Sequence, residues 1–184
     1  MNLNSEATLV EAAQNGHLES FGALYERYHS SMVALAYSML ADRDLAEDAA
    51  QDVFAIACRD LKSLKSKERF AAWLAGICRN TARQILRSKG RYVTPSVRHS
   101  AGNTDIEQNR ADAVRRAVWQ LRSAERELIV LRYYDNLPYE QIAQVLDISI
   151  QAVNGRLIRA KRKIAEHLKR NGFTGGDYET SQNR

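Results

Sequence analysis

A basic and amide-rich stripe between positions 151 and 163 has the clearest chemical potential in this sequence. On a helix, where successive residues turn by about 100°, the apolar Val153, Leu157 and Ala160 fall within one narrow arc. The outward side then carries amides and cations, which can hydrogen-bond phosphate oxygens and base edges in the major groove of DNA. The residues that we predict to contact DNA here are Gln151, Asn154, Arg156, Ile158, Arg159, Arg162 and Lys163.

Basic helices are often no more than solvated surface, so the context from Leu137 to Leu157 matters. This segment has the features of a helix-turn-helix: the small Ala143 where two helices would cross, Asp147 at the tight turn, and Ser149 as a cap for the second helix. The inward apolar positions are Ile142, Leu146, Ile148 and Val153. The combination favours DNA contact by the second helix over plain surface.

A second basic stripe lies upstream, in a segment that lacks acids. Between Arg69 and Thr104 there are seven Lys or Arg and no Asp or Glu. If residues 67–89 form a helix, one face is apolar and the opposite face displays cations and amides suited to phosphates and an unpaired base. Trp73 falls on the apolar face, so we expect it to pack in the core. The predicted DNA-contact residues of this stripe are Arg79, Asn80, Arg83, Gln84 and Arg87.

An acidic stripe occupies the segment from Arg43 to Leu61. On a helix its acids and amides share one face, opposite Ala49 and Val53, and we expect Phe54 to project beside them at the surface. Acidic faces are commonly solvated surface, but an exposed aromatic next to one favours a protein-docking site. The predicted docking residues are Asp44, Glu47, Asp48, Gln51, Asp52 and Phe54.

Charge is strongly segregated along the 184 residues. Residues 1–60 hold three Lys or Arg against ten Asp or Glu, a net charge of −7, whereas residues 61–184 carry a net charge of +12. Such segregation indicates two surfaces whose partners have opposite charge. We interpret one partner as a protein and the other as a polyanion.

Helical periodicity runs through most of the chain, and no alternating run or hairpin signal indicates strands. We therefore expect an all-α protein, with two small helical domains joined by a flexible linker and with the helix-turn-helix in the second. The linker is predicted where periodicity is lost and Gly, Pro and Ser collect. The expected divisions are an N-terminal helical domain at 5–90, the linker at 91–110, a C-terminal domain at 111–171 and a loose tail at 172–184.

Other classes of protein are disfavoured by what the sequence lacks. No run of eighteen apolar residues suggests a membrane span, and the first residues do not resemble a signal peptide. The four histidines are scattered, the acids lack metal-site spacing and no glycine-rich phosphate loop occurs, so we expect no enzyme, metal or cofactor. Cys58 and Cys78, both at apolar-face positions, are expected to be buried free thiols.

Three strings in this order resemble the extracytoplasmic-function (ECF) sigma factors of bacterial RNA polymerase across essentially the whole chain. The strings are DLAEDAAQDVF at 44–54, FAAWLAGICRN at 70–80, and YEQIA at 139–143 with AVNGRLIRAKRK at 152–163. Each is moderately specific, whereas all three in this order and spacing are highly specific.

The resemblance implies a cytoplasmic, monomeric transcription initiation factor that binds core RNA polymerase, directs it to specific promoters and promotes melting of the −10 element. By this resemblance, the acidic helix docks on a coiled coil of the largest polymerase subunit. The 67–89 helix and the loop before it recognise and open the −10 element, and the helix-turn-helix reads the −35 element. The resemblance also implies an anti-sigma factor as a partner.

Four positions depart from the pattern of that family. Gln84 stands where relatives often have Asp, so the preferred −10 sequence can differ. Pro138 replaces a common Ser or Thr and removes a side-chain cap, and Asp147 replaces the turn glycine. Ile158 lies where relatives tend to be polar, and a thymine methyl group is one possible contact for it.

The alternative is a conventional helix-turn-helix regulator that binds duplex DNA without polymerase. Such a protein would carry a ligand-sensing or phosphoacceptor domain on a βα scaffold, and no strand signal supports one. It would also hold its operator tightly by itself. Binding measured with and without core polymerase discriminates between the two hypotheses.

Overall fold

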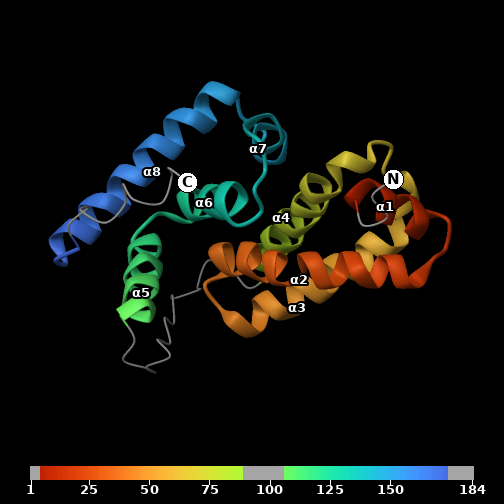
Figure 1. Ribbon diagram of the computed structural model, residues 1–184, viewed down its shortest axis with the longest axis horizontal. Helices are drawn as coiled ribbons and strands as arrows, with labels where there is room; N and C mark the ends of the chain where they lie inside the picture. The colour runs from red at the N-terminus through yellow and green to blue at the C-terminus, as the bar shows by residue number, and fades with distance from the viewer. Residues whose placement is uncertain (1–4, 89–105, 174–184) are drawn as a thin grey trace, which may run out of the picture.

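The computed structural model describes residues 5–88 and 106–173, and within these ranges all of the regular secondary structure is helical (Figure 1). The N-terminal unit consists of α1 (Glu6–Gln14), α2 (Leu18–Leu40), α3 (Arg43–Asp60) and α4 (Phe70–Ser88). Two 3₁₀ turns, Leu61–Ser63 and Lys67–Arg69, connect α3 to α4. The C-terminal unit consists of α5 (Ile106–Trp119), α6 (Ser123–Tyr133), α7 (Tyr139–Leu146) and α8 (Ile150–Arg170). The expectation of an all-α protein with two helical units is confirmed.

Local sequence signals fix the starts of several helices. The side chain of Asp42 accepts a hydrogen bond of 3.1 Å from the backbone N of Leu45, and that of Ser149 accepts one of 3.1 Å from the backbone N of Ala152. Ser149 is the N-cap predicted from the sequence, and each of the two side chains satisfies a donor that the first turn leaves open. The start of α5 differs, because it begins at Ile106 rather than at Ala111. Most of the predicted linker and tail lies outside the described residues.

The core of the N-terminal unit forms between α2, α3 and α4. Leu24 and Leu35 of α2, Val53 of α3 and Phe70 and Leu74 of α4 are completely buried. Burial of such side chains is the main favourable contribution to folding. Helix α1 covers one end, where the Gln14 amide donates to the backbone oxygens of Leu61 and Leu64 over 2.9 and 2.8 Å.

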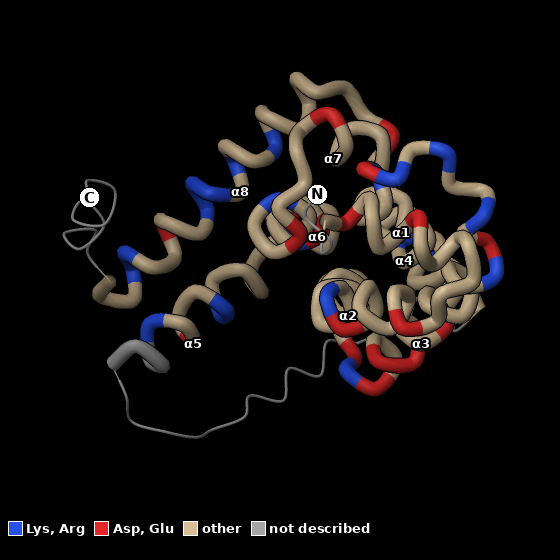
Figure 2. Tube along the Cα trace, turned by 45° about the vertical axis from the view of Figure 1, so that its right-hand side comes forward, with Lys and Arg blue, Asp and Glu red and all other residues tan. Residues whose placement is uncertain are grey.

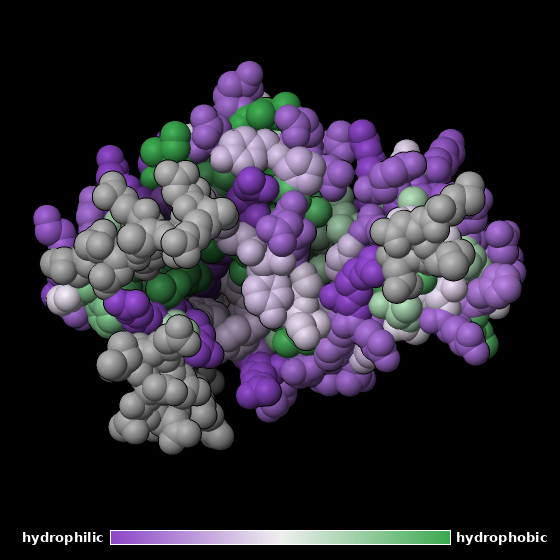
Figure 3. All heavy atoms as spheres, viewed as in Figure 1, coloured by the Kyte–Doolittle hydropathy of each residue, from purple (hydrophilic) through white to green (hydrophobic). Residues whose placement is uncertain are grey.

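The C-terminal unit packs against the N-terminal one, so a single cluster of buried residues extends through both. Leu128 and Leu131 of α6 and Ile142 of α7 belong to the same cluster as the residues of α2 and α4. Helix α6 contacts α2, and α7 contacts α4. On the outside, the face seen in Figure 3 is mostly hydrophilic, with hydrophobic residues visible only in small groups.

Two further sequence expectations can be compared with the structure. Cys78 is buried as expected, but Cys58 is exposed, because it lies on the outer side of α3 one position beyond the buried Ala57. Within residues 5–88 and 106–173, no helix is both long and apolar enough to cross a membrane.

Candidate nucleic-acid interface

Helix α8 turns its cationic and amide side chains outward. Val153, Leu157 and Ala160 are buried, which fixes the rotation of the helix about its axis. Every predicted contact residue of this helix is exposed, including Ile158. Figure 2 shows its Lys and Arg residues as successive blue segments along the helix. The arrangement presents a row of donors suited to phosphate oxygens and base edges.

The cations of this row differ in their electrostatic partners. Lys163 donates to the Glu125 carboxylate of α6 over 2.6 Å, and Arg162 lies 3.7 Å from Glu166. Burial alone would raise the pKa of Glu125, but hydrogen bonds from Lys163 and from the backbone of Arg122 outweigh it and lower that pKa. Within the described part of the chain, Arg156 and Arg159 have no such partners. Among the predicted contact residues of α8, they are therefore the cations most available to a polyanion.

The turn before α8 has the geometry that a helix-turn-helix requires. Asp147 adopts the left-handed conformation, with φ of 55°, and the backbone N of Ile148 donates to the Ala143 carbonyl over 3.0 Å. A short polar side chain tolerates that conformation where glycine is more usual. Ser149 then caps α8, so the turn presents the start of α8, including Gln151, to solvent. The predicted helix-turn-helix is confirmed.

Helix α4 carries the second stripe, and most of it faces outward. Asn80, Arg83, Gln84 and Arg87 are exposed, whereas the opposite side of the helix contributes Leu74 and Ala82 to the core. Trp73 packs against Phe70, with 5.9 Å between ring centroids, and is half-buried. Four of the five predicted residues thus form one exposed row.

Arg79 is the exception in this stripe. Its side chain is 12% exposed and forms an ion pair with Glu127 of α6, whose side chain is 7% exposed. Arg79 also donates to the Val145 carbonyl over 3.2 Å. Helical spacing contains a signal for this burial, because Ala75 and Ala82, four positions before and three after, both face the interior.

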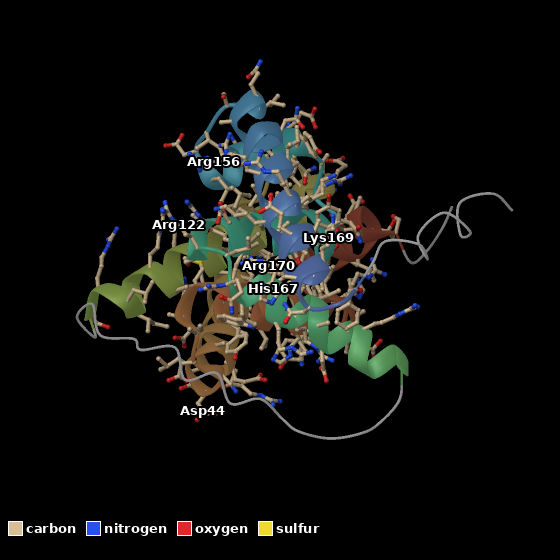
Figure 4. All side chains as sticks on the ribbon, turned by 90° about the vertical axis from the view of Figure 1, so that its left-hand side faces the viewer. Asp44, Arg122, Arg156, His167, Lys169 and Arg170 are labelled. Carbon is tan, nitrogen blue, oxygen red and sulfur yellow. The ribbon has the colours of Figure 1, made fainter. Side chains whose placement is uncertain are left out.

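The acidic face of α3 is largely as predicted. Asp44, Asp48, Gln51 and Asp52 are exposed, and Glu47 is half-buried with its carboxylate 3.8 Å from Nε2 of His29. In Figure 4, Asp44 lies on the opposite side of the view from Arg156. The red segments of α3 and the blue segments of α8 in Figure 2 therefore belong to separate surfaces.

The expectation that Phe54 projects at the surface is wrong. Phe54 is 4% exposed and packs beneath Tyr25 and His29 of α2, at 4.7 and 6.3 Å between ring centroids. The cause is the small size of Ala46, Ala50 and Ala57, which are also buried and widen the inward face of α3. Tyr25, which is 38% exposed, is the aromatic residue that lies at this surface. Sequence spacing within α3 contained no signal for it, because it comes from another helix.

One buried carboxylate stands apart from these surfaces. Ser31 of α2 donates to Oδ1 of Asp135, just after α6, while Oδ2 of Asp135 is buried and has no hydrogen-bond partner among the described residues. Burial raises the pKa of Asp135 to about 7, although the residue as a whole is only half-buried. Across the described residues, no group of three or more His, Cys, Asp or Glu could hold a metal ion.

Comparison with known families matches both units of the chain. The model of Sigma-70 region 2 matches residues 24–92, and the model of Sigma-70 region 4 matches residues 111–164. The first match contains α3 and α4 with the acidic face and the upstream basic stripe. The second contains the helix-turn-helix and most of α8.

Individual relatives match most of the chain. It is 27% identical over 183 residues to an ECF RNA polymerase sigma-E factor of Haemophilus influenzae, covering 90% of this chain and 96% of the relative. It is 29% identical to the RNA polymerase sigma-H factor of Pseudomonas aeruginosa, covering 88% and 92%.

Solved structures match as well. CnrH in complex with the cytosolic domain of CnrY has a TM-score of 0.67 at 26% identity, covering 90% of this chain and 98% of the solved one. The sigma factor RpoE of Bartonella quintana, in complex with the anti-sigma factor NepR, has a TM-score of 0.66 at 27% identity, covering 82% and 98%.

Proposed function

This chain belongs to the sigma-70 family and is an RNA polymerase sigma factor of the ECF class, and from this premise we propose how its surfaces divide the work of promoter recognition. The proposal rests on one observation: the exposed acidic face of α3 is separate from the exposed cationic rows of α4 and α8. A protein partner and a nucleic acid can therefore bind at once without competing for one surface.

The acidic face of α3 docks on core RNA polymerase in this proposal. Its binding residues are those predicted from the sequence: Asp44, Glu47, Asp48, Gln51, Asp52 and Phe54. Phe54 acts from beneath, by supporting Tyr25 at the surface rather than by touching the partner. Complementary charge favours fast and specific association with a basic partner surface.

The two cationic rows read the promoter. The α8 row contacts the −35 element in the major groove, with Gln151 and Asn154 as base-reading amides. Arg156 and Arg159, which have no ion-pair partner among the described residues, lead this row. The α4 row contacts the −10 element, where Asn80 reads a base exposed by melting and Arg83 and Arg87 hold phosphates. Gln84 belongs to the same row, and Arg79 is assigned to this set as well, although in the structure its side chain is held in an ion pair with Glu127.

This division implies two reading domains, residues 5–90 and 111–171, joined by residues 91–110 and followed by a tail at 172–184. Because α5 begins at Ile106, the connection between α4 and α5 is seventeen residues long and spans at most roughly 60 Å, somewhat less than two turns of DNA at about 34–36 Å each. The chain acts as a monomer in the cytoplasm, where it meets polymerase, and catalyses no reaction itself. Because the two solved relatives are complexes, one with an anti-sigma factor, we assign an anti-sigma factor as a further partner.

Run-off transcription with core polymerase over a library of promoters tests the proposal. We expect transcription from a defined subset of promoters that depends on the added chain and is absent with core enzyme alone. A charge-reversed variant, Asp48→Lys with Asp52→Lys, serves as the matched negative control. Transcripts that do not depend on the chain, together with tight operator binding by the chain alone, would favour the conventional regulator.

A further inference from the structure

The segment that joins α3 to α4, the 61–69 connection, lies directly before the α4 row. It consists of two 3₁₀ turns, with Leu64 and Ser66 in extended conformations between them. Leu61 and Leu64 are 3% and 9% exposed and hold the segment to the core, whereas Lys65 and Ser66 are exposed. Because the first turn is short, the backbone carbonyls around it need partners from other parts of the chain.

One side chain of α1 supplies these partners. The Gln14 amide nitrogen donates to the Leu61 carbonyl over 2.9 Å and to the Leu64 carbonyl over 2.8 Å. The backbone N of Leu64 also donates to the Leu61 carbonyl, over 3.1 Å, so the three residues form one closed set of hydrogen bonds. A primary amide carries two N–H donors on a single nitrogen, which is what two neighbouring carbonyls require.

Helix α1 is fixed to the core and can act as a support. Val10 is completely buried, and α1 packs along α2. Figure 1 shows α1 beside the turns that lead into α4. Glu11 also pairs with Lys67 over 2.6 Å, but exposed ion pairs contribute little net stability. Gln14 is therefore the stronger of these two ties between α1 and the 61–69 connection.

The 61–69 connection and α4 share a hollow at the surface. Its volume is about 580 Å³, and its walls include Leu64, Lys65 and Ser66 of the connection and Trp73 and Asn80 of α4. Asn80 is the amide proposed to read an unpaired base of the −10 element. Recognition requires its groups to be held within about 0.5 Å of the productive position, which supporting hydrogen bonds provide. The space beside Asn80 is thus bounded by backbone whose position depends on Gln14.

We propose that Gln14 is a positioning residue for −10 recognition. Its amide holds the 61–69 connection in the shape that places Lys65 and Ser66 on the wall of the hollow. These groups then stand beside the base that Asn80 reads, so α1 influences base preference without touching DNA. The proposal rests on the assignment of the α4 row to the −10 element, and it extends the reading surface for that element to the connection.

Transcription from promoters that differ only in the −10 element tests this role. In the isosteric variant Gln14→Glu, a carboxylate oxygen replaces the donating nitrogen, so both hydrogen bonds are lost and two carbonyls face an anion. We expect the ratio of transcripts from preferred and substituted −10 elements to fall about fivefold or more, the usual effect of one mismatched base pair. The ratio for −35 variants and co-purification with core polymerase should not change. A purely structural role would lower all transcripts alike and leave the −10 ratio as it is.

Two further variants keep the test decisive. Asn15→Asp is the matched control, because it converts the next amide of the chain to a carboxylate at an exposed position, and it should leave both ratios unchanged. Gln14→Asn keeps the amide but shortens its reach by one methylene, so it should lower the −10 ratio less than Gln14→Glu does. It replaces Gln14→Glu if far-ultraviolet circular dichroism shows that the latter has lost its helices. An unchanged −10 ratio in the folded Gln14 variant, or an equal fall in Asn15→Asp, would overturn the proposal.

Hydrogen exchange followed by mass spectrometry reports on the connection itself. Peptides covering residues 61–69 should exchange severalfold faster in Gln14→Glu than in the unsubstituted chain, because the Leu64 N–H is then less well held. Peptides from the middle of α2 and α4 should keep their rates. Equal exchange of the 61–69 peptides in the two proteins would contradict the positioning role.

Asn80→Ala, measured on the same promoters, separates this inference from the proposed function. If Asn80→Ala changes the −10 ratio and the Gln14 variants do not, only the positioning role is contradicted. If transcription does not depend on the added chain, or if the −10 ratio does not respond to Asn80→Ala, the proposed function fails and the inference fails with it.

Discussion

The ring of Tyr25 lies 4.7 Å from the ring of Phe54, measured between centroids, and covers an aromatic residue that helical spacing alone places on the surface. The contact joins α2 to the helix that carries the acidic face. The proposed polymerase-docking surface is therefore built from two helices, with Tyr25 as its exposed aromatic and Phe54 as the support beneath.

Reversing charge on this face should abolish binding to core polymerase. The variant is Asp48→Lys with Asp52→Lys, both on exposed positions of α3. Exposed helix-face charges seldom alter stability by more than about 0.5 kcal/mol, so the fold should persist. Co-purification with core enzyme measures binding, and Glu19→Lys with Glu26→Lys, exposed on α2, is the control. Undiminished co-purification of the α3 variant would refute the docking face.

Removing cations from α8 should weaken −35 recognition. Arg156→Ala and Arg159→Ala each remove a cation that has no partner within the described residues. A contact to a base edge is worth roughly 1–3 kcal/mol, so each change should lower affinity for the −35 element about tenfold or more. Footprinting of the polymerase complex measures this. Lys169→Ala, near the end of α8, should have a much smaller effect, and an equal effect would argue against the assigned row.

Asn80→Ala should impair promoter opening rather than duplex binding. Asn80 is exposed on α4, and its amide can hydrogen-bond a base only after that base has left the stack. Permanganate reactivity of unpaired thymines, measured beside a footprint, separates melting from binding. A variant that lost duplex binding but opened DNA normally whenever bound would reverse the assignment of the two rows.

Stability should fall as pH rises from 5 to 8, and Asp135 should account for part of the fall. Its pKa is raised by burial to about 7 from an ordinary value of 3.8. The folded chain therefore binds the proton more tightly than the unfolded chain. The resulting stabilisation is complete below pH 3.8 and is lost as pH rises through 7. A fully buried group with this pKa shift would contribute at most about 4 kcal/mol to stability. The contribution of Asp135 is smaller, because the residue is partly exposed and solvent screens its charge.

Melting temperatures of Asp135→Asn and of the unsubstituted chain, measured across this range, check the effect. The substitution should flatten the profile, whereas Asp147→Asn at an exposed turn should not. The pKa values of the neighbouring Tyr28 and Cys78 are raised, so both side chains stay protonated throughout this range. Burial also raises the pKa of Glu127, beside Arg79, and this carboxyl therefore makes stability fall with rising pH as well. Identical slopes with and without Asp135 would exclude its contribution.

The isolated chain should bind promoter DNA weakly and with little sequence preference. Each row offers one short helix, and two tethered modules bind strongly only when both sites are engaged together. Affinity should fall steeply with salt, because phosphate contacts release counterions. Mobility shifts near physiological salt, with and without core polymerase, measure this. Tight sequence-specific binding by the chain alone would instead support a conventional regulator.

Local features of the molecule were predictable from the sequence. Asp42 and Ser149 cap helices by reaching a backbone N three residues ahead, and Asp147 takes the turn conformation that its short side chain allows. The exposed row of α8 follows from helical spacing, because the same arc of apolar residues faces inward along the whole helix. Each of these features depends only on residues within a few positions of it in the chain, so the local sequence is enough to predict it.

The tertiary structure alone decided which side chains meet across the fold. Arg79 meets Glu127 across 48 positions, and Ser31 meets Asp135 across 104. Periodicity indicates which side of a helix is apolar, but not how wide a face its neighbours cover, and so it placed Phe54 and Cys58 incorrectly. The width of the buried face is set by packing between helices, where small residues such as Ala50 allow close approach. For that reason the cationic and amide side chains exposed on α4 and α8 could be predicted from the sequence. The burial of Arg79 could not, because it results from the packing of α6 and α7 on α4.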